Sequence, residues 1–273
     1  MIQWVYTNRG RSLNKNILVA CHSVKSPIES DILNSIHVGK SCIGSFCDEE
    51  FQCRLSDNTK DNISAKNKYY AELTAHYWAW KNLDCEYKGV FHYRRFLDFK
   101  DQLPNNFEYV DTAMDQTISK LGLERENIEK VLNENDLILP KKTDFGSYNI
   151  YENYKTFHYE KDIILMMKTI LDFDPSLYQL LNEIMYSHHK MYCCNMFVAR
   201  KEIFDNCVEW IFKILFEIEK NVNLEDYKDE QSRVFGFLGE RLVNIYFENF
   251  IRTQKPKFKE LPIVKVQEAK SLC

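Results

Sequence analysis

Four chemically active side chains follow one another directly after residues 89–91, Gly-Val-Phe, which are typical of the end of a buried strand. They are His92, Tyr93, Arg94 and Arg95, and no typical turn residue separates them from that stretch. Arginine is always charged and can bind two phosphate oxygens at once. Because charge stabilisation does most of the work when a phosphate group departs, two adjacent arginines could neutralise a diphosphate without a metal ion. The alternative is a solvated strand end whose arginines pair with nearby acids.

A metal-dependent site would need acidic ligands near the substrate. The chain contains one D-x-D triplet, Asp172-Phe173-Asp174, and Pro175 follows it directly. That position is typical of a helix end and the cap of the next helix. We therefore expect no metal cofactor, with Mg²⁺ or Mn²⁺ bound by other residues as the alternative.

Polar residues around the first long helical pattern are candidates to bind a nucleotide. Asp61 and Asn62 lie just ahead of a helix that we expect to begin at Ser64, and Asn67 lies in its first turns. The free N–H groups at a helix N-terminus suit phosphate or ribose.

The C-terminal part of the chain holds a second set of polar candidates. Asn195 opens an apolar stretch and needs a hydrogen-bond partner if it is buried. Asp229 and Gln231 open a helix, where acidic residues are favoured by the helix dipole in any case. Glu240 and Arg241 lie in mid-helix among apolar neighbours. An acid in that setting either has a raised pKa and serves as a base, or forms an ion pair.

Composition excludes several classes of protein. The chain has 273 residues with 36 basic and 40 acidic side chains, a formal net charge of −4, which argues against a nucleic-acid partner. It has only eight glycines and no G-x-G, Walker or G-x-S-x-G motif, which argues against a dinucleotide site, a P-loop and that type of hydrolase. With nine irregularly spaced cysteines, no signal-peptide pattern and no long apolar run, we expect a cytoplasmic protein with reduced thiols.

Strand and helix patterns alternate along the chain, which predicts an α/β fold with a mostly parallel sheet. The expected strands cover residues 16–20, 34–38, 87–93, 136–140, 194–200 and 261–266. The expected helices cover residues 64–83, 116–135 with an interruption near Gly122, 160–171, 176–187, 201–220 and 229–250. We expect loops at 41–62 and 100–116, an aromatic binding loop at 141–158, and a single domain over residues 1–273.

Five motifs in this order are similar to a known family. They are "DNIS-x-KN-x-YY-x-ELT", "HYRRF", "LILPKK", "CNMF" and "RVFGFL". Together they resemble the bacterial capsule and exopolysaccharide glycosyltransferases catalogued as domain of unknown function 4422, over about residues 16–265. The first fifteen residues precede the usual start of that family, and residues 26–41 are only loosely alike.

The resemblance implies a GT-A-like fold, with a nucleotide-sugar-binding half at about 16–140 and a helical acceptor-side half at about 141–265. It also implies a UDP-sugar donor and a glycan acceptor, which we expect to be lipid-linked, and some relatives are associated with galactofuranose transfer. The implied donor site consists of Asp61, Asn62, Asn67, His92, Tyr93, Arg94 and Arg95. The implied acceptor and sugar site consists of Asn195, Gln231 and Arg241, with Glu240 or Asp229 as the base.

Two rival functions stay open from the sequence. The aromatic segment 145–159 suits a non-catalytic glycan-binding protein, because aromatic rings stack on sugars. A nucleotide-sugar hydrolase or phosphotransferase would use the same basic motif without a glycan acceptor. The basic segment 252–266 is either a peripheral contact with the inner face of the cytoplasmic membrane or a solvated tail.

Overall fold

The computed structural model describes residues 14–22, 28–42, 53–111 and 114–267 of the chain. Within these residues ten strands form one sheet, whose main path runs β11-β7-β10-β4-β1-β2-β3, and β12 adds to it by pairing with β5 and β6. The sheet strands are β1 (Lys15–Cys21), β2 (Leu33–His37), β3 (Leu55–Ser56), β4 (Tyr87–His92), β5 (Arg95–Leu97), β6 (Phe107–Asp111), β7 (Leu137–Pro140), β10 (Phe197–Arg200), β11 (Phe258–Leu261) and β12 (Ile263–Gln267). A small second sheet pairs β8 (Thr143–Asp144) with β9 (Lys190–Met191).

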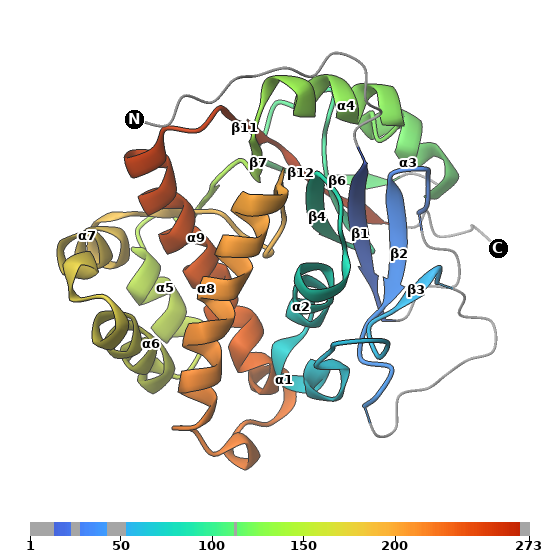
Figure 1. The fold of residues 1–273 in the computed structure, drawn as a ribbon. Helices are drawn as coiled ribbons and strands as arrows, with labels where there is room; N and C mark the ends of the chain where they lie inside the picture. Colours follow the sequence, from blue (N-terminus) through green and yellow to red (C-terminus); the bar gives the residue numbers. More distant parts are fainter. Residues whose placement is uncertain (1–13, 23–27, 43–52, 112–113, 268–273) are drawn as a thin grey trace, which may run out of the picture.

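Helices cover both faces of this sheet (Figure 1). They are α1 (Asn67–Tyr70), α2 (Leu73–Asn82), α3 (Met114–Leu121), α4 (Arg125–Glu134), α5 (Ile150–Phe157), α6 (Glu160–Phe173), α7 (Tyr178–Ser187), α8 (Lys201–Glu219) and α9 (Val234–Gln254). The mixed α/β architecture with parallel pairing along β3-β2-β1-β4 confirms the predicted fold class.

The two faces of the sheet explain the two hydrophobic cores. Successive strand residues point to opposite faces, so Leu18 and Val90 pack with α2 and helices α5 to α9, whereas Ile17 and Val19 pack with α3 and α4. The central strands β1, β4, β7 and β10 are buried on both faces, which is why they read as largely apolar runs in the sequence.

Several expected elements differ in the structure. The helix expected over 64–83 is broken at Ala71, and the expected binding loop 141–158 contains helix α5. The expected loop 100–116 contains strand β6. The expected strand 261–266 corresponds to the end of β11 and most of β12. Because these two strands belong to the main sheet, the segment 252–266 is part of the fold, and its interpretation as a solvated tail is wrong.

Other expectations are confirmed. Helix α6 ends at Phe173, and the Asp174 carboxylate caps the next turn by accepting a hydrogen bond from the Ser176 backbone N–H at 3.0 Å. The D-x-D triplet therefore has the structural role expected of it. None of the described helices is both long enough and apolar enough to cross a bilayer. The division of the chain into a donor half and an acceptor half stays a prediction.

Candidate active site

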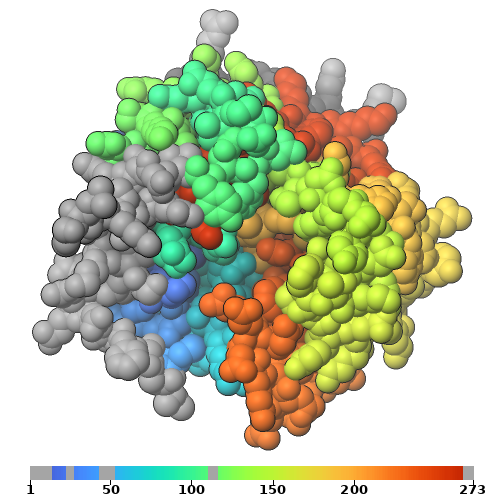
Figure 2. All heavy atoms as spheres, turned by 180° about the vertical axis from the view of Figure 1, so that it is seen from behind, coloured from blue at the N-terminus to red at the C-terminus, as the bar shows by residue number. Residues whose placement is uncertain are grey.

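A cleft of about 650 Å³ opens at the carboxyl ends of β1, β2 and β4. Ala20, Val38 and His92 line it, and each lies at or just beyond the last residues of one of these three parallel strands. Ligands of open α/β sheets usually bind at this edge. Figure 2 shows the molecular surface hollowed between the segments near residues 95, 150 and 230.

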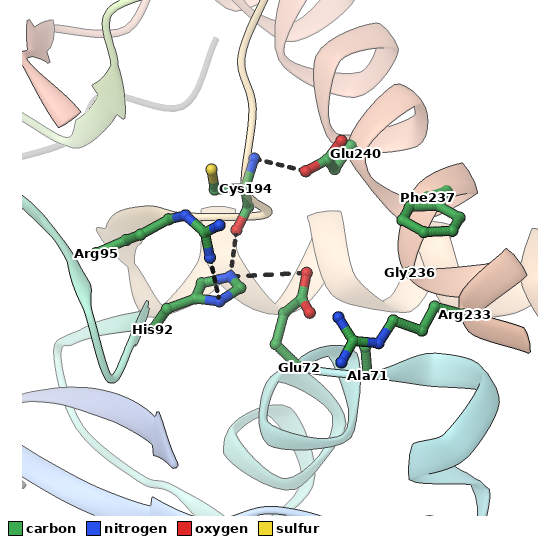
Figure 3. Close-up of a pocket in the computed structure, with 9 residues that line it drawn as sticks. All are labelled: Ala71, Glu72, His92, Arg95, Cys194, Arg233, Gly236, Phe237 and Glu240. Carbon is green, nitrogen blue, oxygen red and sulfur yellow. Dashed lines mark hydrogen bonds and ion pairs between the residues drawn. The ribbon is translucent and has the colours of Figure 1, made fainter. Parts of the chain in front are cut away.

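A smaller chamber of about 140 Å³ continues from this cleft. Its lining comes from the start of α2, the end of β4, the segment before β10 and the start of α9 (Figure 3). The cleft and the chamber share the lining residues Ala71, Glu72, His92, Arg95 and Arg233. The two spaces are therefore parts of one site, and we call them the outer cleft and the inner chamber.

The basic motif of the sequence forms a tight turn at the mouth of this site. His92 at the end of β4 pairs with Arg95 at the start of β5, so Tyr93 and Arg94 are the two turn residues. The Arg94 guanidinium lies over the Tyr93 ring at 4.6 Å from its centroid. The Tyr93 ring in turn meets His22 edge-on, at 4.9 Å between centroids. The turn thus presents both arginines to the outer cleft.

His92 is held as a neutral imidazole. Its Nε2 lies 2.9 Å from the Cys194 carbonyl oxygen, which fixes the proton on Nε2, and its Nδ1 accepts from Arg95 Nη1 at 3.5 Å. Burial and the neighbouring Arg95 charge lower the pKa of His92 to about 4. His92 therefore orients Arg95 and does not itself carry a charge near neutral pH.

Three arginines in the described part of the chain form no ion pair, and all three line the outer cleft. They are Arg94, Arg95 and Arg233. The other five described arginines are each paired with a carboxylate, namely Arg54, Arg125, Arg200, Arg241 and Arg252. The outer cleft also contains Lys68, and its acids are Glu72, Asp229 and Glu230. The net positive charge of the outer cleft is therefore small. What suits a bound anion is the set of unpaired guanidinium groups that line the cleft together.

The broken first helix sets one wall of the site. Ala71 adopts φ 49° and ψ −132°, a conformation that side-chain-bearing residues rarely adopt, and it separates α1 from α2. The Asn67 side chain bridges the break, since its Nδ2 donates to the Ala71 carbonyl at 2.7 Å and to Thr74 Oγ1 at 3.1 Å. This break turns Glu72 toward the inner chamber.

The segment before β10 supplies the opposite wall. Cys194 and Asn195 both have positive φ, at 71° and 51°. Asn195 is buried, and its Nδ2 donates to Glu72 Oε1 at 2.6 Å and to the Gly236 carbonyl at 3.0 Å. Asn195 therefore ties α2, β10 and α9 together behind the chamber.

Glu240 faces the chamber from α9 with both of its oxygens engaged. Its Oε1 accepts from the Cys194 backbone N–H at 2.8 Å, and its Oε2 accepts from Arg241 Nη1 at 3.1 Å. Burial raises the pKa of Glu240, and the nearby Glu72 carboxylate adds to that rise while Arg241 opposes it. The raised pKa and the ion pair that the sequence left as alternatives are thus both present.

The predicted site residues fall into two groups. Those that line the outer cleft or the inner chamber are Asn67, His92, Tyr93, Arg94, Arg95, Asp229 and Glu240. Those that line neither space are Asp61, Asn62, Asn195, Gln231 and Arg241.

Each residue of the second group contacts another part of the protein. Asp61 Oδ1 accepts from the Tyr77 hydroxyl at 3.0 Å, and Asn62 Oδ1 accepts from the Ser64 backbone N–H at 3.2 Å. Gln231 Nε2 donates to the Phe157 carbonyl at 3.0 Å. A direct contact of these side chains with a ligand in the cleft stays a prediction, and their present contacts indicate supporting roles.

Arg241 is buried behind Glu240. Its Nη2 donates to Asn153 Oδ1 at 2.8 Å, and its guanidinium lies over the Tyr154 ring. Arg241 therefore links α9 to α5 and orients Glu240 from behind.

Sequence reasoning assigned no role to two residues that line both parts of the site, Glu72 and Arg233. Both lie inside motifs that carry the family resemblance, in "ELT" and "RVFGFL". Neither stood out because a single acid or arginine at a helix start is common on any protein surface.

The described residues contain no group of three or more His, Cys, Asp or Glu side chains arranged to hold a metal ion. Metal independence stays a prediction.

The chain is similar to a solved glycosyltransferase structure and to one protein family. The apo structure of the WbbM bifunctional glycosyltransferase is similar to this chain with a TM-score of 0.83 and 31% sequence identity, over 93% of this chain and 46% of that one. The chain thus spans about half the length of that protein. A comparison with curated proteins found no match. The model of one family matches residues 16–253, most of the chain. This chain belongs to that family, which is described as a domain of unknown function, DUF4422.

Proposed function

We propose that this protein is a glycosyltransferase that moves a sugar from a UDP-sugar donor to a glycan acceptor. The likeness to a bifunctional glycosyltransferase structure supports a transferase in general. The observation that carries the proposal here is the convergence of Arg94, Arg95 and Arg233, unpaired among the described residues, on one cleft at the carboxyl edge of the sheet. A diphosphate is the group in such a donor that needs this charge.

The proposed reaction uses the arginines to stabilise the leaving group. As the bond between the sugar and the diphosphate breaks, negative charge grows on the departing phosphate oxygen. Preorganised cations stabilise that charge more in the transition state than in the bound donor, and this difference lowers the barrier. Two of the three have a contact that orients them, Arg95 with His92 Nδ1 at 3.5 Å and Arg94 over the Tyr93 ring.

We further propose the biological setting that the resemblance implied. The donor carries galactofuranose or a related hexose, and the acceptor is a lipid-linked glycan of capsule, exopolysaccharide or lipooligosaccharide synthesis. The protein acts in the cytoplasm, with peripheral contact at the inner face of the membrane. No metal cofactor takes part.

The test begins with the donor. Thermal-shift measurements against UDP, UDP-glucose, UDP-galactose and UDP-galactofuranose should show stabilisation by at least one UDP-sugar. Arg94→Ala should then lower turnover by about 100-fold or more, as expected for loss of a preorganised charge contact. Arg125→Ala is the matched control, because Arg125 pairs with Glu129 outside the cleft.

The outcomes separate the rival functions. Binding of oligosaccharide without any response to UDP-sugars would identify a glycan-binding protein and overturn the proposal. Release of UDP with no acceptor-dependent product, across a panel of lipid-linked glycans, would favour a hydrolase.

A further inference from the structure

Two carboxylates, Glu72 and Glu240, face the inner chamber from different helices (Figure 3). A group that takes a proton from an incoming hydroxyl needs a free oxygen directed into the space where the hydroxyl binds. The two residues differ in this respect, although they lie in the same chamber.

Both oxygens of Glu240 already accept a hydrogen bond from the protein in the described structure, one from the Cys194 N–H and one from Arg241. Glu72 is different. Its Oε1 accepts from Asn195 Nδ2 at 2.6 Å and lies 3.7 Å from His92 Nε2, and no described residue donates to its Oε2. The Glu72 side chain is 16% exposed and lines both the outer cleft and the inner chamber.

Glu72 is held in this position by neighbouring residues whose backbone is strained. Ala71, directly before it, and Asn195, its hydrogen-bond donor, both have positive φ. The Asn195 Nδ2 donates twice, to Glu72 and to Gly236, and its buried Oδ1 has no hydrogen-bond partner in the described structure. Strained and unsatisfied groups that persist in a fold cluster at functional sites. Here they converge on the Glu72 carboxylate.

The inner chamber has room for one six-membered ring and none for a nucleoside. Its volume is about 140 Å³, and an apolar cavity of about 150 Å³ accommodates benzene, so the hydroxyl groups of a bound sugar would extend toward the outer cleft. Arg95 and Arg233 line both the chamber and the outer cleft, so a diphosphate held between them would place its sugar in the chamber. The nucleoside would then occupy the larger outer cleft.

We infer that the inner chamber binds the transferred sugar and that Glu72 is the catalytic carboxylate there, an inference that rests on the proposed function. The acceptor hydroxyl oxygen bonds to the anomeric carbon, and its proton passes to Glu72 Oε2. The bond between the anomeric carbon and the phosphate oxygen breaks, and its electron pair leaves on the diphosphate beside the arginines. Glu240 is then a positioning residue, which holds the Cys194 backbone and Arg241.

Glu72→Gln is the variant that tests this assignment. The glutamine oxygen can still accept from Asn195, so the fold and the Asn195 contact are kept while the negative charge is lost. We expect the thermal shift with UDP to stay at the wild-type value and UDP release from the donor to fall about 100-fold or more, the usual contribution of a general base. Glu183→Gln, which alters a surface carboxylate paired with Arg252, should leave both unchanged.

A second variant distinguishes catalysis from a structural role. Glu72→Ala leaves a space for a small carboxylate, so sodium formate should restore part of its activity and should not restore that of Glu72→Gln. Turnover of Glu72→Gln within about threefold of wild type would overturn the inference, as would a formate effect of equal size in both variants. If UDP and UDP-sugars fail to bind the wild-type protein, the proposed function itself fails.

Discussion

Removing Arg233 should weaken nucleotide binding without weakening the fold. Arg233 lies in the last turn before α9, is exposed, and forms no ion pair in the described structure. Burial lowers the pKa of His22 in the same cleft, and the nearby Arg233 charge lowers it further. An exposed arginine with no paired carboxylate contributes little to the stability of the ligand-free protein.

The magnitude follows from the contact that Arg233→Ala would remove. A hydrogen bond to a charged group contributes about 1.5–3 kcal/mol. At about 1.4 kcal/mol per tenfold change, the Kd for UDP should rise about 10-fold to 150-fold. Because the side chain is exposed, salt screens the interaction, and the effect should approach the lower figure at high ionic strength.

Isothermal titration with UDP and urea unfolding of the same variant provide the test. We expect weaker UDP binding together with a free energy of unfolding equal to or above that of the wild type. Residues that serve function are often not the most stabilising choice at their position. Arg252→Ala is the matched control. Arg252 donates two hydrogen bonds to Glu183 at 2.8 and 2.9 Å, so its loss should lower stability slightly and leave UDP binding unchanged.

The reasoning would be refuted by the opposite pattern. If Arg233→Ala lowers the free energy of unfolding and leaves the Kd for UDP at its wild-type value, then Arg233 is a structural residue. The claim that the unpaired arginines form an anion site would then lose its support.

Three further predictions concern metal, pH and packing. Transferase or donor-hydrolysis activity should persist in excess EDTA, and a full loss that Mn²⁺ restores would show that a metal is required. Burial lowers the pKa of His76 to about 4, so between about pH 6.5 and pH 4 only the unfolded state takes up this proton and stability falls as the pH falls. His76→Phe should make the melting temperature less dependent on pH in that window, and an unchanged slope would contradict this cause. Gly89→Ala should destabilise the protein by about 1–3 kcal/mol in urea unfolding, because the added Cβ would lie 2.7 Å from Val198 Cγ2 and 3.0 Å from the Phe197 carbonyl; a wild-type midpoint would show that β4 and β10 can separate slightly.

The sequence alone determined the fold class and one edge of the site. Apolar runs that are buried on both faces of a sheet are visible as continuous stretches, so β1, β2, β4 and β7 could be placed within a few residues. His92, Tyr93, Arg94 and Arg95 could be assigned to the end of a strand for the same reason. The prediction of one continuous helix over residues 64–83 was wrong. The Ala71 break has no glycine or proline to signal it, and Asn67 stabilises it through a contact four residues away.

Only the tertiary structure decided which charges are paired and which are free. Arg241 and Arg94 are the same residue type, yet one is buried against Glu240 and Asn153 whereas the other has no carboxylate partner among the described residues. Glu72 and Glu240 likewise differ only in what the folded chain brings to their oxygens. Some of the contacts that decide this join residues more than a hundred positions apart, such as Asn195 with Glu72, and local sequence patterns carry no information about contacts of that kind.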